Sequence, residues 1–282
     1  MKKLVVVLLV ALMAVAVVGC RAEKAVIDIN GSDTMVNIGA ALAENFMKTN
    51  KNIEIVVSGG GSGTGIAALI NGATNIAQSS RAMKQSEKDQ ASAKGLLNEI
   101  IVAWDGLAVT VHPSNPVREL TLAQIAKIYR GEITNWQEVG GNDANIVLLS
   151  RDTTSGTYIF FKEFVVQENG KLKSAEFSPA AMMMPSTEAI VQESARNVNA
   201  IGYVGLGYLK TEIKALGVKV NDDSAASSPS VATVLDKTYS LARPLYFYTV
   251  GELKGAIKTY VDYVLSDNGQ KVVRELDFVP IR

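Results

Sequence analysis

The sequence predicts an α/β fold, because short runs of β-branched residues alternate along the chain with apolar helical patterns. In three places such a run leads through a turn of Gly, Ser and Thr residues directly into a helical pattern. The chain of 282 residues is also long enough to form two lobes, each with its own hydrophobic core. We therefore expect a two-lobed α/β protein with polar turns where strands meet helices.

The first residues have the pattern of a bacterial signal peptide. Two lysines precede fifteen residues, Leu4 to Val18, that are apolar throughout, and a glycine stands before Cys20. A cysteine at this point resembles a bacterial lipobox, in which the cysteine receives a lipid and becomes the mature N-terminus. We predict a signal peptide over residues 1–19, lipidation at Cys20 and a tether over residues 20–25. A plain signal peptide with an incidental cysteine and an uncleaved anchor are the alternatives.

The mature chain is nearly neutral and poor in metal-binding residue types. Removing residues 1–19 leaves 282 − 19 = 263 residues with 26 basic and 28 acidic side chains, a net charge of −2. This balance argues against a nucleic-acid partner, so local donors must bind any anion. Cys20 is the only cysteine and His112 the only histidine, so we expect no disulfide framework, no transition-metal site and no cofactor.

The first polar turn, Asn30–Met35, follows an expected strand at Val26–Ile29 and precedes a helix whose apolar residues recur at a spacing of four. Taken alone, Ser32 or Asp33 would be an ordinary helix N-cap. Two further turns of similar composition follow, and together they favour a binding role for this turn over an ordinary cap.

The second turn, Ser58–Gly65, connects the strand pattern Ile53–Val57 to another apolar helix. Glycines let backbone N–H groups approach an anion closely, and the helix N-terminus adds partial positive charge. No Gly-Lys-Ser/Thr follows, so the nucleotide P-loop is excluded. A dinucleotide-binding match through Gly63, Gly65 and Ala68 is weak, and a flexible turn without a ligand is the simpler alternative.

The third turn, Ser150–Thr157, follows the apolar run Ile146–Leu149 and precedes a helix that ends at Gly170. It carries Arg151 four residues before Ser155. Hydroxyls and amides are neutral donors, whereas a guanidinium makes charge-assisted bonds that suit phosphate. The three turns together predict an oxyanion-binding site.

The remaining elements continue the alternation of strands and helices. Capping boxes are expected at Ser86 with Asp89 and at Thr121 with Gln124, each at the start of a helix. Strands are expected at 75–81, 100–104, 107–111 and 246–249, and helices at 86–95, 121–131 and 253–264.

Seven segments, spread in order over essentially the whole mature chain, carry a family resemblance. They are Gly31–Met35, Ser58–Gly65, Ala77–Arg81, Ile133–Trp136, Ser150–Thr157, Ala200–Val204 and Ala242–Tyr248. In order and spacing they resemble the substrate-binding lipoprotein of the bacterial high-affinity phosphate ABC importer. The resemblance implies a two-lobed, type II periplasmic-binding-protein fold with a hinge of two crossing linkers, expected near Gly106–Val111 and Tyr239–Arg243. Residues 26–107 and 243–282 would form lobe 1, and residues 108–242 lobe 2.

The resemblance also implies a set of phosphate-binding residues drawn from both lobes. We add Ser32, a hydroxyl in the turn Asn30–Met35, and Arg81, the arginine that follows Ser80. Many relatives carry an aspartate in place of Ser80, so an acceptor for protonated phosphate would have to be Asp33, Asp152 or a hydroxyl lone pair. The candidates are Ser32, Thr34, the Met35 amide, Ser62, Ser80, Arg81, Arg151, Ser155, the Gly156 amide and Thr157.

Two functional classes remain in view. A receptor would bind inorganic phosphate and deliver it to the permease of an ABC importer, anchored by its lipid on the extracytoplasmic side of the cell membrane, as a monomer. An exported phosphoryl-transfer enzyme would need a nucleophile with a base or a metal site, and Ser155 has no plausible base in the sequence. We therefore expect no catalytic residue. Within the receptor class, sulfate or molybdate is the alternative ligand.

Overall fold

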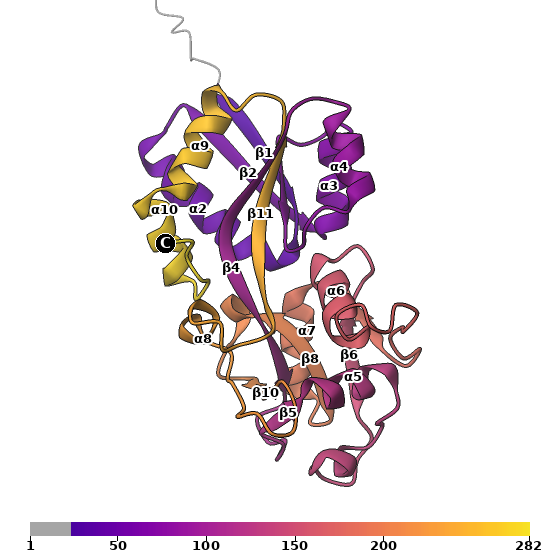
Figure 1. Cartoon of the computed structure of the whole chain (residues 1–282). Helices are drawn as coiled ribbons and strands as arrows, with labels where there is room; N and C mark the ends of the chain where they lie inside the picture. Colours follow the sequence, from indigo (N-terminus) through magenta and orange to yellow (C-terminus); the bar gives the residue numbers. More distant parts are fainter. Residues whose placement is uncertain (1–23) are drawn as a thin grey trace, which may run out of the picture.

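The computed structural model describes residues 24–282 and shows two α/β lobes joined by long strands (Figure 1). The predicted signal peptide and Cys20 lie outside the described residues. Only the end of the predicted tether is described, and strand β1 already begins at Ala25.

The upper lobe in Figure 1 is built on strands in the order β2-β1-β3-β11-β4. Strand β1 runs parallel to β2 and β3, whereas β11 runs antiparallel to β3 and β4. The elements are β1 (Ala25–Gly31), η1 (Asp33–Met35), α2 (Val36–Thr49), β2 (Ile53–Gly60), α3 (Ser62–Ile70), β3 (Ile76–Ser79), α4 (Gln85–Ser92), β4 (Leu97–Val111), β11 (Ala242–Val250), α9 (Gly255–Leu265) and α10 (Asp267–Glu275).

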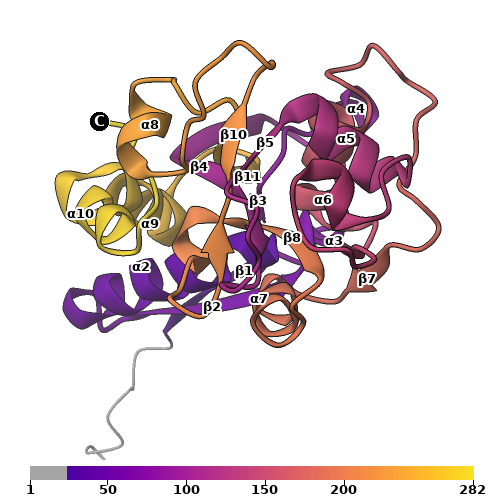
Figure 2. The same ribbon diagram turned by 90° about the horizontal axis from the view of Figure 1, so that it is seen from below.

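Both faces of this sheet are covered by helices. Successive side chains of β11 point to opposite faces of the sheet, and in the middle of the strand both sets are apolar and buried. Leu245 and Phe247 join a buried cluster with Phe46 of α2, which also includes residues of α9 and α10. Tyr246 and Tyr248 face the opposite cluster, formed with α3 and α4. Figure 2 shows α2, α9 and α10 on one side of the strands and α3 and α4 on the other.

The lower lobe continues the sheet from β4 in the order β4-β8-β6-β7, with β9 also paired to β4. Strands β5 and β10 form a separate small sheet. The elements are β5 (Glu119–Thr121), α5 (Leu122–Arg130), η2 (Trp136–Val139), β6 (Val147–Arg151), α6 (Gly156–Phe161), the π-helix η3 (Lys162–Val166), β7 (Met182–Met184), α7 (Thr187–Arg196), β8 (Ala200–Gly205), η4 (Leu206–Tyr208), β9 (Lys214–Ala215), β10 (Gly217–Lys219) and α8 (Val231–Leu235).

Strand β8 divides the interior of this lobe in the same way. Ile201 and Tyr203 enter a large cluster with residues of α5, α6 and η3, in which the Tyr203 and Phe161 rings stack at 4.0 Å between centroids. Ala200 and Val204 face a smaller cluster with residues of α7. The predicted two-lobed α/β architecture is confirmed.

Strand β4 crosses between the lobes and changes partner as it does so. Gly106 pairs with Ala242 of β11, whereas Leu107 pairs with Gly205 of β8. The two strands predicted at 100–104 and 107–111 are therefore wrong as separate elements, because β4 is one strand of 15 residues. The proposed lobe boundaries fall at this change of partner.

One predicted helix start is confirmed and one is wrong. Thr121 caps α5 by accepting the N–H of Gln124. Helix α4 instead begins after Lys84, whose N–H donates to Glu87, so Ser86 and Asp89 form no cap. Within residues 24–282, no helix is both long and apolar enough to cross a membrane.

Candidate functional site

The three predicted turns meet where the two lobes face each other. Strands β2, β1 and β3 are parallel neighbours, so their carboxyl ends lie along one edge of the sheet. The chain leaves β1 through Ser32, enters α3 at Ser62 and leaves β3 at Ser80. Helix α6 of the lower lobe, which begins at Gly156, brings Thr157 to the same place.

Five hydroxyl side chains are buried at this junction in two hydrogen-bonded groups, which together we call the hydroxyl cluster: Ser32, Ser62 and Ser80, and Thr34 with Thr157. Each is at most 2% exposed. Ser32 Oγ donates to Ser80 Oγ at 2.9 Å, and Ser62 Oγ accepts the backbone N–H of Ser80 at 3.1 Å. Thr34 and Thr157 join the two lobes through a 2.8 Å bond between their Oγ1 atoms.

The backbone at the start of α6 lies very close to the opposite lobe. A Cβ atom on Gly156 would stand 2.2 Å from Ser62 Oγ and 2.7 Å from Ser80 Oγ, so only glycine fits here in this arrangement. The Gly63 N–H also donates to the Thr154 carbonyl across the lobes at 2.9 Å. The lobes are therefore in contact around the cluster, which is the closed arrangement.

The predicted ligand Arg151 lies at the same junction, at the end of β6, but its guanidinium makes an interlobe ion pair. Its Nη2 donates to Asp33 Oδ2 at 2.6 Å. It also donates to Thr187 Oγ1 and to the carbonyls of Met184 and Pro185. These contacts use four of the five N–H groups that a guanidinium carries.

Two further predicted ligands have local partners. Ser155 Oγ caps α6 by accepting the N–H groups of Thr157 and Tyr158, which leaves its own hydroxyl proton to donate. The Arg81 guanidinium is directed away from the cluster, because it makes a two-pronged pair with Glu87 at 2.7 Å for each bond. The Met35 amide donates to the Ser32 carbonyl within η1.

Arg243 and Asp105 were not predicted as site residues, yet they form a buried ion pair that adjoins the cluster. Arg243 Nη2 donates to Asp105 Oδ2 at 3.0 Å and to Thr157 Oγ1 at 2.9 Å. Burial raises the pKa of Asp105, although Arg243 opposes the shift. Burial lowers the pKa of Arg243, and the nearby Arg151 lowers it further, whereas Asp105 opposes the shift. The only sequence signal was the place of Arg243 in a predicted linker.

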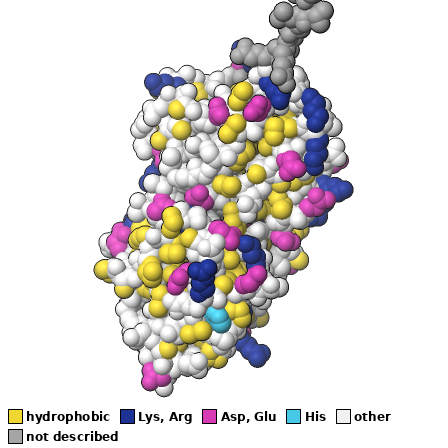
Figure 3. Space-filling model, turned by 180° about the vertical axis from the view of Figure 1, so that it is seen from behind, with side chains coloured by type: hydrophobic (Ala, Val, Ile, Leu, Met, Phe, Trp, Pro, Cys, Tyr) yellow, Lys and Arg dark blue, Asp and Glu magenta, His cyan; other side chains and the backbone are white. Residues whose placement is uncertain are grey.

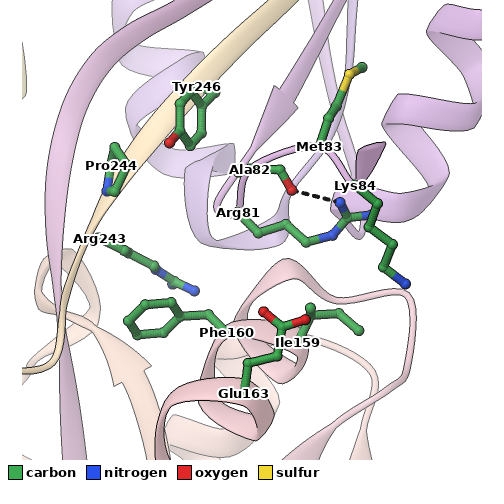
Figure 4. Close-up of a pocket in the computed structure, with 10 residues that line it drawn as sticks. All are labelled: Arg81, Ala82, Met83, Lys84, Ile159, Phe160, Glu163, Arg243, Pro244 and Tyr246. Atoms are coloured by element: carbon green, nitrogen blue, oxygen red, sulfur yellow. Dashed lines mark hydrogen bonds between the residues drawn. The ribbon is translucent and has the colours of Figure 1, made fainter. Parts of the chain in front are cut away.

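A pocket of about 360 Å³ opens between the lobes beside this pair (Figure 4). Arg81 and Tyr246 line it from the upper lobe, and Phe160 and Glu163 from α6 and η3 of the lower lobe. Figure 4 shows the Arg243 side chain extending over the Phe160 ring, whose centroid lies 5.4 Å from the guanidinium carbon. None of the cluster hydroxyls lines this pocket, so Arg243 stands between the pocket and the cluster.

Comparisons with known proteins agree with this architecture. Residues 21–268 match the sequence profile of the PBP superfamily domain. The chain is 36% identical over 273 residues to the protein SphX of Synechococcus elongatus. The alignment covers 92% of this chain and 79% of that protein. It is 30% identical to the phosphate-binding protein PstS of Borreliella burgdorferi over the full length of both chains.

Solved structures show the same fold. One, from Clostridium perfringens and assigned as a phosphate ABC transporter substrate-binding protein, contains bound phosphate; it has a TM-score of 0.82 and 33% identity, and the match covers 91% of this chain and all of that one. An ABC-type phosphate transport receptor from Vibrio cholerae has a TM-score of 0.72 and 28% identity, with 91% and 100% covered. These neighbours confirm the predicted type II periplasmic-binding-protein fold. The chain belongs to the PBP superfamily, in the family of its PstS-named phosphate-binding relatives.

Proposed function

We propose that the protein is an extracytoplasmic receptor that binds inorganic phosphate between its lobes and delivers it to an ABC importer. The observation that carries the proposal is the hydroxyl cluster, which is buried, draws donors from both lobes and adjoins the Arg243–Asp105 ion pair. The PstS relative and the two solved structures described above bind phosphate or serve phosphate transport, as their names state. The ligands would be the hydroxyl cluster, the Gly156 amide, Ser155 and Arg151, whereas the Met35 N–H is already donated to the Ser32 carbonyl.

Local donors, and not the overall charge, would hold the anion. Figure 3 shows acidic and basic side chains interspersed over the face that it presents. Neutral hydroxyls and amides bind a dianion through directional hydrogen bonds, while Arg151 adds charge. Among the described residues, no carboxylate contacts a cluster hydroxyl, so hydroxyl oxygens would accept the proton of HPO₄²⁻. Asp33 and Asp152 are engaged by Arg151, Gly60 and Thr154.

A receptor fits the cluster better than an enzyme does. The polar partners of the cluster hydroxyls within residues 24–282 are hydroxyls, backbone amides and Arg243, none of which is a general base. Within the same residues, no group of three or more acidic, His or Cys side chains is placed to hold a metal ion. We propose that the protein performs no catalysis of its own.

Calorimetric titration of the protein lacking residues 1–20 tests the ligand. Phosphate, sulfate and molybdate would each be titrated at the same ionic strength after extensive dialysis. We expect phosphate to bind at least ten times more tightly than either of the others. Tighter binding of sulfate or molybdate would show that this anion, and not phosphate, is the ligand. No binding of any of the three would refute the proposed receptor function.

We further propose that a lipid on Cys20 holds the protein at the outer face of the cell membrane. Cys20→Ser should move it from the membrane fraction to the soluble fraction, because no helix among the described residues is both long and apolar enough to cross a membrane. Ala25→Ser, which places the same hydroxyl on the exposed start of β1, should leave the protein in the membrane fraction. Retention of Cys20→Ser in membranes after a high-salt wash would contradict the lipid anchor.

A further inference from the structure

Arg243 reaches the hydroxyl cluster from the start of strand β11, where Ala242 pairs with Gly106 of the crossing strand β4. Its Nε and Nη2 both donate to Asp105 Oδ2, at 3.3 and 3.0 Å. Nη2 also donates to Thr157 Oγ1 at 2.9 Å and lies 3.5 Å from Thr34 Oγ1. The guanidinium thus touches a predicted phosphate ligand from each lobe.

The planar shape of the guanidinium shows which of its edges faces the cluster. One hydrogen of Nη2 lies beside Nε, on the edge that Asp105 occupies. The other lies beside Nη1, so the bond to Thr157 places the Nη1–Nη2 edge toward the hydroxyls. This edge is the two-pronged fork that matches two oxygens of a phosphate.

The fork is incompletely used within the protein. Arg243 is 1% exposed, and its Nη1 has no hydrogen-bond partner among the described residues. Leaving buried donors without a partner is unfavourable, more so when they belong to a charged group. Arg151, by contrast, already spends four of its five N–H groups on protein atoms. Of the two arginines, Arg243 therefore has the larger donor capacity left for a ligand.

We propose that Arg243 is a phosphate-binding residue whose Nη1–Nη2 edge holds the anion, and that Asp105 is the positioning residue for it. Asp105 can fix the guanidinium because its own Oδ1 is held by the Leu206 N–H at 3.0 Å. Phe160 covers the guanidinium face from the lower lobe, so closure also removes this cation from water. The proposal rests on the proposed function and adds a second charged ligand to it.

The test must separate a ligand from a mere counter-ion of Asp105. Arg243→Gln alone leaves a buried aspartate without its cation, which is destabilising, so the informative variant is Asp105→Asn with Arg243→Gln. This pair is neutral, and the asparagine oxygen can still accept the Leu206 N–H. If Arg243 only neutralises Asp105, the double variant binds phosphate like the wild type.

We expect the double variant to bind phosphate at least about 100-fold more weakly than the wild type in calorimetry. Arg243→Lys, which keeps the charge but not the fork, should bind about 10-fold more weakly. Arg130→Gln removes a largely buried arginine that pairs with the partly exposed Glu132 and Glu168 and contacts no cluster hydroxyl, and it should bind normally. Circular dichroism tests whether each variant is folded.

The outcomes separate this inference from the function on which it rests. A wild-type protein that does not bind phosphate would refute the proposed function itself. A wild type that binds, together with a double variant and Arg243→Lys that each bind within threefold of it, would overturn the role of Arg243 and leave the function standing. If only the double variant is unfolded, Arg243→Lys decides alone by the same threefold limit.

Discussion

Gly156→Ala is expected to weaken phosphate binding at least about 100-fold, because the added methyl would prevent the lobes from closing. Its carbon would stand 2.2 Å from Ser62 Oγ and 2.7 Å from Ser80 Oγ, which are less than contact distances. The variant keeps every donor, so the loss would come from the missing closed state and not from a missing ligand. Titration calorimetry measures the effect directly.

Gly72→Ala is the matched control for this substitution. Its Cβ would have open space, although its φ of +71° makes the residue slightly costly to the fold. This control should bind phosphate normally even if its melting temperature falls. Wild-type affinity in Gly156→Ala would show that phosphate is not held in the closed arrangement seen here.

Arg151→Ala is the second substitution with a large expected effect. It removes a proposed charged ligand and leaves Asp33 without its interlobe partner, a loss of about 2–5 kcal/mol in binding. Asp33→Asn separates the two roles, because it weakens the interlobe pair and keeps the arginine. We expect Arg151→Ala to reduce phosphate affinity at least about tenfold more than Asp33→Asn does.

Two results would contradict this account of Arg151. Equal losses of phosphate affinity in the two variants would show that Arg151 only bridges the lobes and does not bind the anion. Binding by Arg151→Ala within threefold of the wild type would remove it from the site altogether. Thermal denaturation in the absence of phosphate should show whether both variants remain folded, since Arg151 also donates to Met184, Pro185 and Thr187 of its own lobe.

The turns of the site were predictable because their signals are local. A β-branched run, a glycine or hydroxyl turn and an apolar helix lie within about twenty residues in each case, and the strand order β2-β1-β3 then brings two of the turns together. The Asp105–Arg243 pair gave no such signal, because its members are 138 residues apart. The strands predicted at 100–104 and 107–111 leave Asp105 and Gly106 between them, whereas β4 is continuous there and Asp105 is buried and paired with Arg243.

The direction of individual side chains could not be predicted from the sequence either. Arg81 follows Ser80 directly and was assigned to the site, yet its guanidinium pairs with Glu87 six residues later. The same Glu87 accepts the N–H of Lys84 and so sets the start of α4 in place of the expected Ser86 cap. Glu87 thus accounts for both the direction of the Arg81 side chain and the start of α4, because its carboxylate pairs with the guanidinium and accepts the Lys84 N–H.

A crystal structure of the protein with phosphate tests the central claim most directly, namely that donors of both lobes enclose one phosphate ion. The account predicts a tetrahedral anion within about 3.2 Å of the Ser62 and Ser80 hydroxyls on one side and of the Gly156 amide and Thr157 hydroxyl on the other. An anion bound outside the hydroxyl cluster, or held by the donors of a single lobe, would contradict it.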